Sequence, residues 1–148
     1  MDIIFDIDGT LLDISHRTHF LDKSPPDWHG FRNPKLKRWD EPIVPVIATL
    51  NALKVDHRII LASGRIMHEK DDTLFSLRPH IPDIDDFPFY MRSEKDYRHD
   101  TETKADLLNK MFEAGLNPVM AFDDRPAVIR VWREKGLLVA DVGKGKEF

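Results

Sequence analysis

The 148-residue chain has no cysteine, no long apolar run and no excess of positive charge. Without cysteine it cannot form disulfides, bind a metal through thiolates or use a cysteine nucleophile. No stretch approaches the roughly 20 apolar residues of a membrane span, and the N-terminus lacks the pattern of a signal peptide. Because the net charge is −4, the molecule as a whole does not attract nucleic acid, and a polyanion would need a local basic patch. We therefore expect a cytoplasmic protein without a membrane segment.

The pattern of apolar residues predicts a single α/β domain over residues 1–148, with 41% hydrophobic and 32% charged residues. Short apolar runs alternate with segments of helical periodicity. The expected strands are residues 2–5, 58–62, 87–91, 119–122 and 137–140, and the expected helices are 42–53, 67–77, 101–114 and 127–135. Strands that alternate with helices predict a doubly wound, Rossmann-like parallel sheet.

The most informative stretch, residues 3–13, is an apolar run followed by two aspartates, Asp6 and Asp8, and a Gly-Thr turn. In open α/β sheets, ligands bind at the carboxyl ends of the strands. Two carboxylates crowded at such an end repel each other unless a cation or a proton lies between them. The pattern therefore favours a magnesium site that also supplies a nucleophile and an acid, although an isolated D-x-D-G can equally be a polar turn.

Three further segments place polar or charged residues at the end of a strand or the start of a helix. A second strand ends in Ser-Gly-Arg at residues 63–65, Lys104 begins a helical segment, and another strand ends in Asp123 and Asp124. With D-x-D-G-T at residues 6–10, this order of motifs resembles the haloacid dehalogenase superfamily over residues 3–142. The resemblance implies that fold, with a minimal or absent cap formed by an insertion at residues 14–41.

The resemblance also implies phosphoryl transfer through an aspartyl-phosphate. Asp6 would be the nucleophile, and Asp8 would protonate the leaving oxygen and then activate water. A dehalogenase expels halide and needs no such acid, so Asp8 favours a phosphatase. Ser63 and Lys104 would hold the phosphoryl group, although each taken alone is explained by a turn hydroxyl or a solvated helix face.

Oxygen ligands without cysteine or histidine favour Mg²⁺ over softer metals. By the resemblance, the ligands would be Asp6, the backbone carbonyl of Asp8, and Asp123. The residues expected to support the site from behind are Thr10, Asp100 and Asp124.

The second half of the chain is similar to the phosphatase domain of bacteriophage polynucleotide kinase-phosphatase. That domain has an arginine eight residues before an aspartate and a lysine four residues after it, as in Arg92, Asp100 and Lys104. The substrate-binding residues implied by this similarity are Arg65, Arg92, Arg98 and Arg125. A site without a large cap is open and can admit the end of a polymer.

The insertion supports a polymer substrate through its composition. Residues 28–39 hold three aromatic and four basic residues, a mixture that can stack bases and follow a phosphate backbone. The aromatic residues are equally explained as anchors that pack an irregular loop onto the core.

We predict a Mg²⁺-dependent polynucleotide 3′-phosphatase that acts on 3′-phosphorylated DNA or RNA ends in nucleic-acid repair. The sequence has no G-x-x-x-x-G-K-[ST] loop, so a kinase or a ligase would be a separate partner. The alternatives are a phosphatase of small phosphomonoesters such as nucleotides, and a non-catalytic domain that binds nucleic-acid ends.

Overall fold

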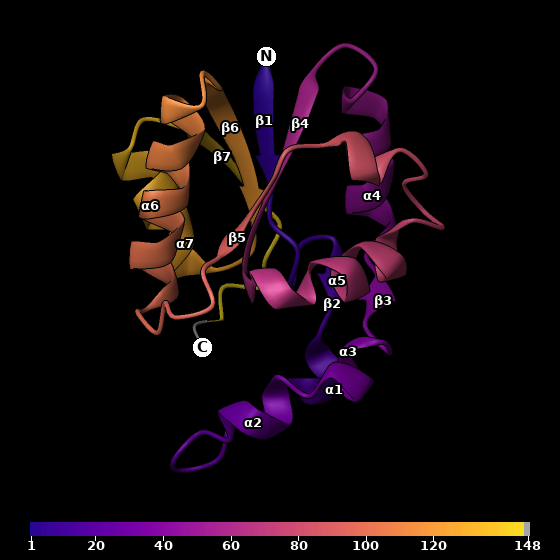
Figure 1. The fold of residues 1–148 in the computed structure, drawn as a ribbon, viewed down its shortest axis with the longest axis vertical. Helices are drawn as coiled ribbons and strands as arrows, with labels where there is room; N and C mark the ends of the chain where they lie inside the picture. The colour runs from indigo at the N-terminus through magenta and orange to yellow at the C-terminus, as the bar shows by residue number, and fades with distance from the viewer. Residues whose placement is uncertain (147–148) are drawn as a thin grey trace.

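The centre of the molecule is a five-stranded parallel sheet in the order β5-β4-β1-β6-β7 (Figure 1). The computed structural model describes residues 1–146. The strands of this sheet are β1 (Asp2–Phe5), β4 (Arg58–Ile66), β5 (Phe89–Arg92), β6 (Pro118–Asp123) and β7 (Leu138–Asp141). The predicted doubly wound α/β fold is confirmed.

Helices cover both faces of the sheet (Figure 1). The helices are α4 (Val44–Leu53) and α5 (Lys70–Leu77) on one face, and α6 (Asp100–Glu113) and α7 (Pro126–Glu134) on the other. Successive side chains of a strand point to opposite faces. Ile3 and Phe5 of β1 accordingly join the core under α4 and α5, and Ile4 joins the core under α6 and α7.

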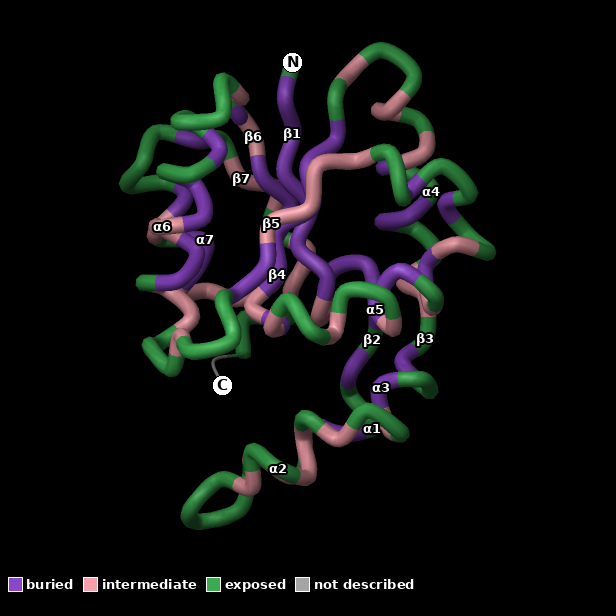
Figure 2. The backbone as a smooth tube through the Cα atoms, in the orientation of Figure 1, coloured by how far each residue is buried: buried purple, intermediate pink, exposed green. Residues whose placement is uncertain are grey.

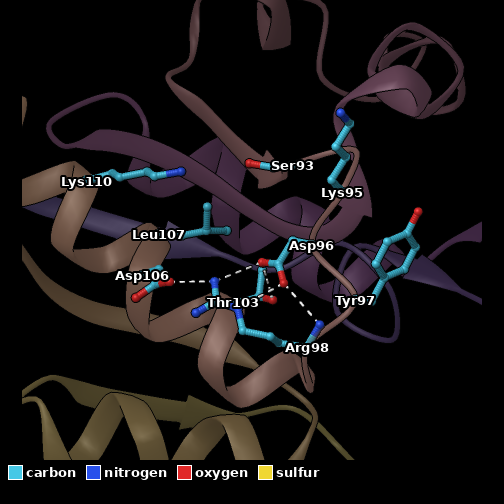
Figure 3. A pocket seen from close by; sticks show the side chains of 9 residues that line it. All are labelled: Ser93, Lys95, Asp96, Tyr97, Arg98, Thr103, Asp106, Leu107 and Lys110. Carbon is cyan, nitrogen blue, oxygen red and sulfur yellow. Dashed lines mark hydrogen bonds and ion pairs between the residues drawn. The ribbon is translucent and has the colours of Figure 1, made fainter.

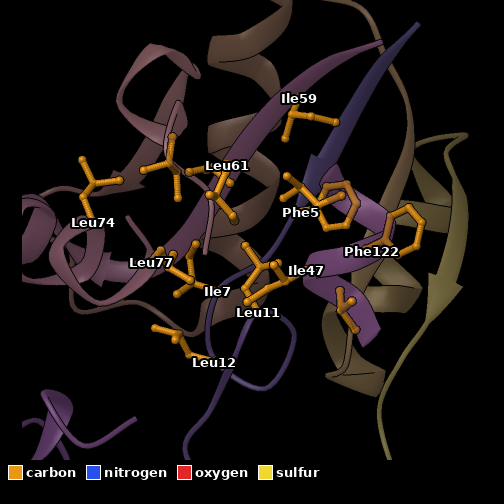
Figure 4. Packing of buried hydrophobic residues seen from close by; sticks show 14 of the residues in the cluster. Phe5, Ile7, Leu11, Leu12, Ile47, Ile59, Leu61, Leu74, Leu77 and Phe122 are labelled. Atoms are coloured by element: carbon orange, nitrogen blue, oxygen red, sulfur yellow. The ribbon is translucent and has the colours of Figure 1, made fainter. Parts of the chain in front are cut away.

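The core under α4 and α5 fixes the central strands against one another (Figure 4). The rings of Phe5 on β1 and Phe122 on β6 stack with centroids 4.3 Å apart. Complete burial of side chains of this size stabilises a fold by about 1.5–3 kcal/mol each. Because Phe5 and Phe122 are the partners in the β1–β6 register, the residues that follow them emerge at the same edge of the sheet.

Strand β4 is longer than the sequence pattern predicts. It continues beyond Ala62 to Ile66, and its pairing with β5 becomes irregular between Ser63 and Ile66. The predicted helix at 67–77 begins as a 3₁₀ turn, η1 (Met67–Glu69), before α5, and a second 3₁₀ turn, η2 (Ile84–Asp86), precedes β5. The extension carries residues 63–65 into the sheet, where a loop was expected.

The insertion forms a narrow arm that projects past the carboxyl ends of the strands (Figure 1). At its base β2 (Leu12–Asp13) pairs antiparallel with β3 (Glu41–Pro42). The three helices of the arm are single turns: α1 (Ser15–Thr18), α2 (Trp28–Phe31) and α3 (Pro34–Lys37). Most of the arm is exposed or partly exposed (Figure 2), so the predicted absence of a full cap layer is confirmed.

Side chains that cap α2 and α3 explain why these two short helices form. Asp27 accepts a hydrogen bond from Gly30 N at 2.8 Å, and Asn33 accepts one from Lys35 N at 3.0 Å. Pro34 occupies the first turn of α3, where its missing N–H costs nothing. None of the helices within residues 1–146 combines the length and apolarity needed to cross a membrane.

Candidate active site

Three carboxylates meet where the central strands end. Asp6 follows β1, Asp123 closes β6, and Asp124 comes next in the chain. One oxygen of each lies within 4.8 Å of the others. The parallel pairing of β1 with β6 brings together groups that are more than 100 residues apart in sequence.

The charges in this cluster are unbalanced without a cation. Burial raises the pKa of Asp6 well above its usual value, and Asp123 and Asp124 add to the effect against the opposing charge of Lys104. Burial and the Asp123 carboxylate likewise raise the pKa of Asp124 to about 7. Because a divalent cation would relieve this repulsion and oxygen donors suit Mg²⁺, the three carboxylates fit a magnesium ion.

Two hydrogen bonds orient Asp123 within the cluster. Its Oδ2 accepts from Trp132 Nε1 at 2.9 Å and its Oδ1 accepts from the Arg125 backbone N–H at 3.1 Å. Each carboxylate oxygen has a second lone pair that can still face a cation. Trp132 is completely buried on α7, so this orientation is tied to the core.

Asp124 lies in the cluster itself, whereas the sequence analysis placed it behind the metal. Thr10 Oγ1 donates a hydrogen bond to Asp124 Oδ1 at 3.2 Å, which is the supporting contact expected of Thr10. Gly9 has a φ of 83°, and a Cβ there would lie 2.1 Å from Asp124 Oδ2. The D-G-T turn therefore needs its glycine both for backbone conformation and for the approach of Asp124.

Lys104 lies beneath the cluster with only 1% of its surface exposed, so the alternative of a solvated helix residue is wrong. Its Nζ donates to Asp6 Oδ1 at 2.5 Å and to the Ala62 carbonyl at 3.2 Å, and lies 3.5 Å from Asp123 Oδ2. Burial opposes the charge, but Asp6 and Asp123 outweigh it and raise the pKa of Lys104. The ammonium group is therefore a permanent positive charge beside Asp6.

Asp8 is held by arginines. Arg65 Nε lies 3.0 and 3.1 Å from the two Asp8 oxygens, and Arg17 Nη2 donates to Oδ1 at 3.2 Å. Burial alone would raise the pKa of Asp8, but Arg65 and then Arg17 hold it at about 2. The Asp8 carboxylate is thus ionised at neutral pH, so an acid role requires a change in its surroundings.

A buried aspartate, Asp40, connects the two arginines that hold Asp8. It accepts hydrogen bonds from Arg17 Nε at 2.8 Å and Arg65 Nη2 at 2.7 Å, and His16 Nε2 lies 2.8 Å away. Neither Arg17 nor Asp40 was expected at the site from the sequence. No periodicity links them, and the only signal was their place near the two ends of the insertion that follows the D-x-D motif.

Arg92, predicted to bind substrate, and Asp100, predicted to support the site, form an ion pair with each other. Arg92 Nη2 contacts Asp100 Oδ1 at 3.1 Å and Arg92 Nε donates to the Gly64 carbonyl at 2.8 Å. Arg125 Nη1 lies 3.4 Å from the second Asp100 oxygen. A Cβ at Gly64 would come 2.3 Å from Asp100, so the glycine of the Ser-Gly-Arg segment makes room for this carboxylate.

Ser63 and Arg98 have different surroundings. Ser63 is 1% exposed, and its Oγ accepts a hydrogen bond from the Arg65 backbone N–H at 3.1 Å.

Arg98 lines a hollow of about 380 Å³ beside α6 (Figure 3). None of the clustered carboxylates lines this hollow. There Arg98 pairs with Asp96 at 3.0 Å and Asp106 at 2.5 Å, and its predicted contact with substrate stays a prediction.

The sequence matches the family model described as "Polynucleotide kinase PNKP phosphatase domain" over residues 1–147. A putative bifunctional polynucleotide kinase/RNA ligase of Autographa californica nuclear polyhedrosis virus is 27% identical over 134 residues. That alignment covers 89% of this chain and 18% of the viral protein.

Solved structures with a similar fold include one from the same kind of enzyme system. A chain of the Pnkp1/Rnl/Hen1 RNA repair complex is 27% identical with a TM-score of 0.80, covering 98% of this chain and 43% of that one. A haloacid dehalogenase-like hydrolase of Streptococcus pneumoniae, 17% identical with a TM-score of 0.72, covers 95% of this chain and 83% of its own, and shows the shared fold. This chain spans less than half the length of the viral protein and of the Pnkp1/Rnl/Hen1 chain.

Proposed function

Because the chain belongs to the family of polynucleotide kinase phosphatase domains in the haloacid dehalogenase superfamily, we propose that it removes 3′-phosphates from nucleic-acid ends. The observation that carries the proposal is the buried cluster of Asp6, Asp123 and Asp124, with Lys104 beside Asp6 and Asp8 held close by on the same turn. It joins a nucleophile, a cation site and a proton carrier at one edge of the sheet.

In the proposed reaction, an oxygen of Asp6 attacks phosphorus and the ester bond to the 3′-oxygen breaks. Bound Mg²⁺ would neutralise charge on the phosphate and on the three carboxylates. Lys104 fixes the orientation of Asp6 through its 2.5 Å contact and adds a positive charge for the phosphoryl oxygens. Water then attacks the aspartyl-phosphate, which releases inorganic phosphate and restores Asp6.

Asp8 carries the proton in both steps. A phosphate dianion that enters the site competes for Arg65 and Arg17, and loss of these contacts raises the pKa of Asp8 from about 2. Protonated Asp8 then donates to the leaving 3′-oxygen, which would otherwise depart as an alkoxide. In the second step Asp8 takes a proton from the attacking water.

RNA ends are the first substrate to test, because two of the relatives are named for an RNA ligase and an RNA repair complex. Those names also support a role beside a separate kinase or ligase, since this sequence has no phosphate-cradling kinase loop. DNA ends are the second substrate to test.

The test is Mg²⁺-dependent phosphate release from three substrates: a 3′-phosphorylated oligonucleotide, its 5′-phosphorylated counterpart and a 3′-mononucleotide. The Asp6→Asn variant supplies the background. We expect kcat/KM for the 3′-phosphorylated strand to exceed the other two values by at least about tenfold. Equal or better turnover of the mononucleotide would assign the protein to small phosphomonoesters.

A further inference from the structure

The arm carries a hollow of about 400 Å³ that none of the catalytic residues lines. Its lining residues are Trp28, His29, Arg32, Asn33 and Pro34. Trp28 has 45% of its surface exposed. The Arg32 guanidinium lies 5.3 Å from the centre of the Trp28 ring, a cation–π geometry that keeps the arginine beside the indole.

A short chain of contacts joins this hollow to the active site. Trp28 meets the Phe31 ring edge-on at 6.1 Å, and the Arg17 guanidinium lies 4.6 Å from the centre of the Phe31 ring. Arg17 also donates to the Phe31 carbonyl at 3.1 Å and, through Nη2, to Asp8 at 3.2 Å. Two side chains therefore separate Trp28 from Asp8, and the arm lies past the carboxyl end of the sheet (Figure 1).

The charge of the arm opposes that of the molecule. Residues 15–40 contain six Lys or Arg residues against three Asp, while the whole chain carries a net charge of −4. Lys37 pairs with Glu69, and Arg38 lies 3.6 Å from Asp72. Among the ion pairs found within residues 1–146, none involves Arg32, which lines the hollow, or Lys35, which follows the lining residue Pro34 in the chain. Both cations therefore keep their charge for a ligand.

We propose that this hollow binds a nucleotide of a single-stranded nucleic acid, upstream of the 3′-phosphate held at Asp6. The base stacks on Trp28, and Arg32 and Lys35 contact the adjoining phosphates. An exposed indole beside cations has the composition of surfaces that bind single strands. Such surfaces combine aromatic side chains, on which bases stack, with positive charges along the phosphate backbone. The order of the strand, from arm to active site, rests on the proposed 3′-phosphatase function, but binding to the arm does not.

Binding is measured first, by fluorescence anisotropy of a labelled single strand of about ten nucleotides that carries no terminal phosphate. We expect Trp28→Ala to weaken binding by roughly fivefold or more, the size of a lost base-stacking contact. Trp28→Phe should recover part of the loss because it keeps an aromatic ring. The matched control is Phe112→Ala, which removes an aromatic side chain of similar exposure, 43%, from α6.

Arg32→Ala should weaken binding and reduce the salt dependence by about 0.7 in the slope of log affinity against log salt, the value for one lost phosphate contact. Wild-type affinity in both Trp28→Ala and Arg32→Ala would overturn the proposal. Such a result would leave the arm as a surface for another class of partner.

Kinetics then separate this inference from the proposed function. If both hold, Trp28→Ala raises KM for the 3′-phosphorylated strand roughly fivefold and changes KM for a 3′-mononucleotide by less than about twofold. An equal rise for both substrates contradicts the arm subsite and leaves the phosphatase intact. Absence of 3′-phosphate release in the wild type contradicts the proposed function, while the binding data still decide the subsite.

Discussion

At the scale of single residues, the surroundings of Asp8 constrain the chemistry most. Its pKa of about 2 keeps Asp8 in the ionised form at neutral pH, whereas protonation of a leaving group needs the acid form. We predict that Asp8→Asn lowers kcat for a 3′-phosphorylated oligonucleotide by ~10²–10⁴-fold, the usual effect of losing a general acid. p-Nitrophenyl phosphate should lose far less, because p-nitrophenolate leaves without a proton. Steady-state kinetics on both substrates check this, and an equal loss argues against the acid role.

The carboxylate cluster predicts how stability depends on pH and Mg²⁺. Without metal, Asp124 has a pKa of about 7 when folded and an ordinary value of 3.8. A raised pKa means that folded protein binds more protons than unfolded protein between these values, so stability falls as pH rises through that window. Thermal unfolding in a chelator should show a falling Tm, and added Mg²⁺ should remove the decline.

The control for this pH dependence is Asp124→Asn, which removes one of the two carboxyl groups with a raised pKa and should make the decline in the chelator shallower. Two results would contradict a carboxylate cluster that binds protons without metal and Mg²⁺ when it is present. One is a Tm that rises with pH in the metal-free wild type. The other is a Tm that Mg²⁺ leaves unchanged above neutral pH.

How far the sequence predicts the site depends on the local signal of each residue. Asp6 and Asp123 end apolar strands, and a parallel sheet must bring such ends to one edge. Arg17 and Asp40 have no such signal, because their burial arises only in the folded protein. There Arg17 contacts Asp8, and Asp40 contacts Arg65. The presence of the Asp124 carboxylate in the cluster is equally a matter of side-chain direction, which residue spacing does not encode.

At the scale of elements, Asp40 joins the arm to the active site. We predict that Asp40→Asn destabilises the protein by about 3–5 kcal/mol, since it leaves the buried Arg17 and Arg65 without a full counter-charge. It should also lower kcat through misplacement of the arginines at Asp8. Chemical unfolding and steady-state kinetics with the 3′-phosphorylated oligonucleotide measure the two effects.

The matched control for Asp40→Asn is Asp72→Asn, which removes the acidic partner of Arg38 in a pair 3.6 Å apart whose side chains are 67% and 46% exposed. An exposed pair of this kind contributes about 0–1 kcal/mol. If the two variants lose the same stability, the buried network does not hold the arm.

At the scale of the whole molecule, a parallel sheet with helices on both faces was predictable, because strands that alternate with helices bury both faces of the sheet in this way. The extension of β4 to Ile66 was not, because Gly64 and Arg65 have no strand-like pattern. Tertiary contacts decide it: β5 supplies a pairing partner and Asp100 occupies the space beside Gly64.

The same scale gives a prediction about coupled activities. This 148-residue chain has no G-x-x-x-x-G-K-[ST] loop, so nothing in it cradles the phosphates of ATP in that manner. We expect no transfer of phosphate from labelled ATP to a 5′-hydroxyl oligonucleotide, under conditions in which 3′-phosphate is released. Labelled oligonucleotide product would show a kinase activity that the sequence and fold do not explain.

The most direct test of the central claim follows the phosphate itself. A nucleic-acid strand with a labelled 3′-phosphate is mixed with excess protein and Mg²⁺, and the reaction is quenched in acid within the first turnover. We expect label to appear on the wild-type protein before free phosphate accumulates, and Asp6→Asn to take up none. Release of phosphate without labelled protein, or label retained in Asp6→Asn, would contradict attack by Asp6 on a 3′-phosphorylated end.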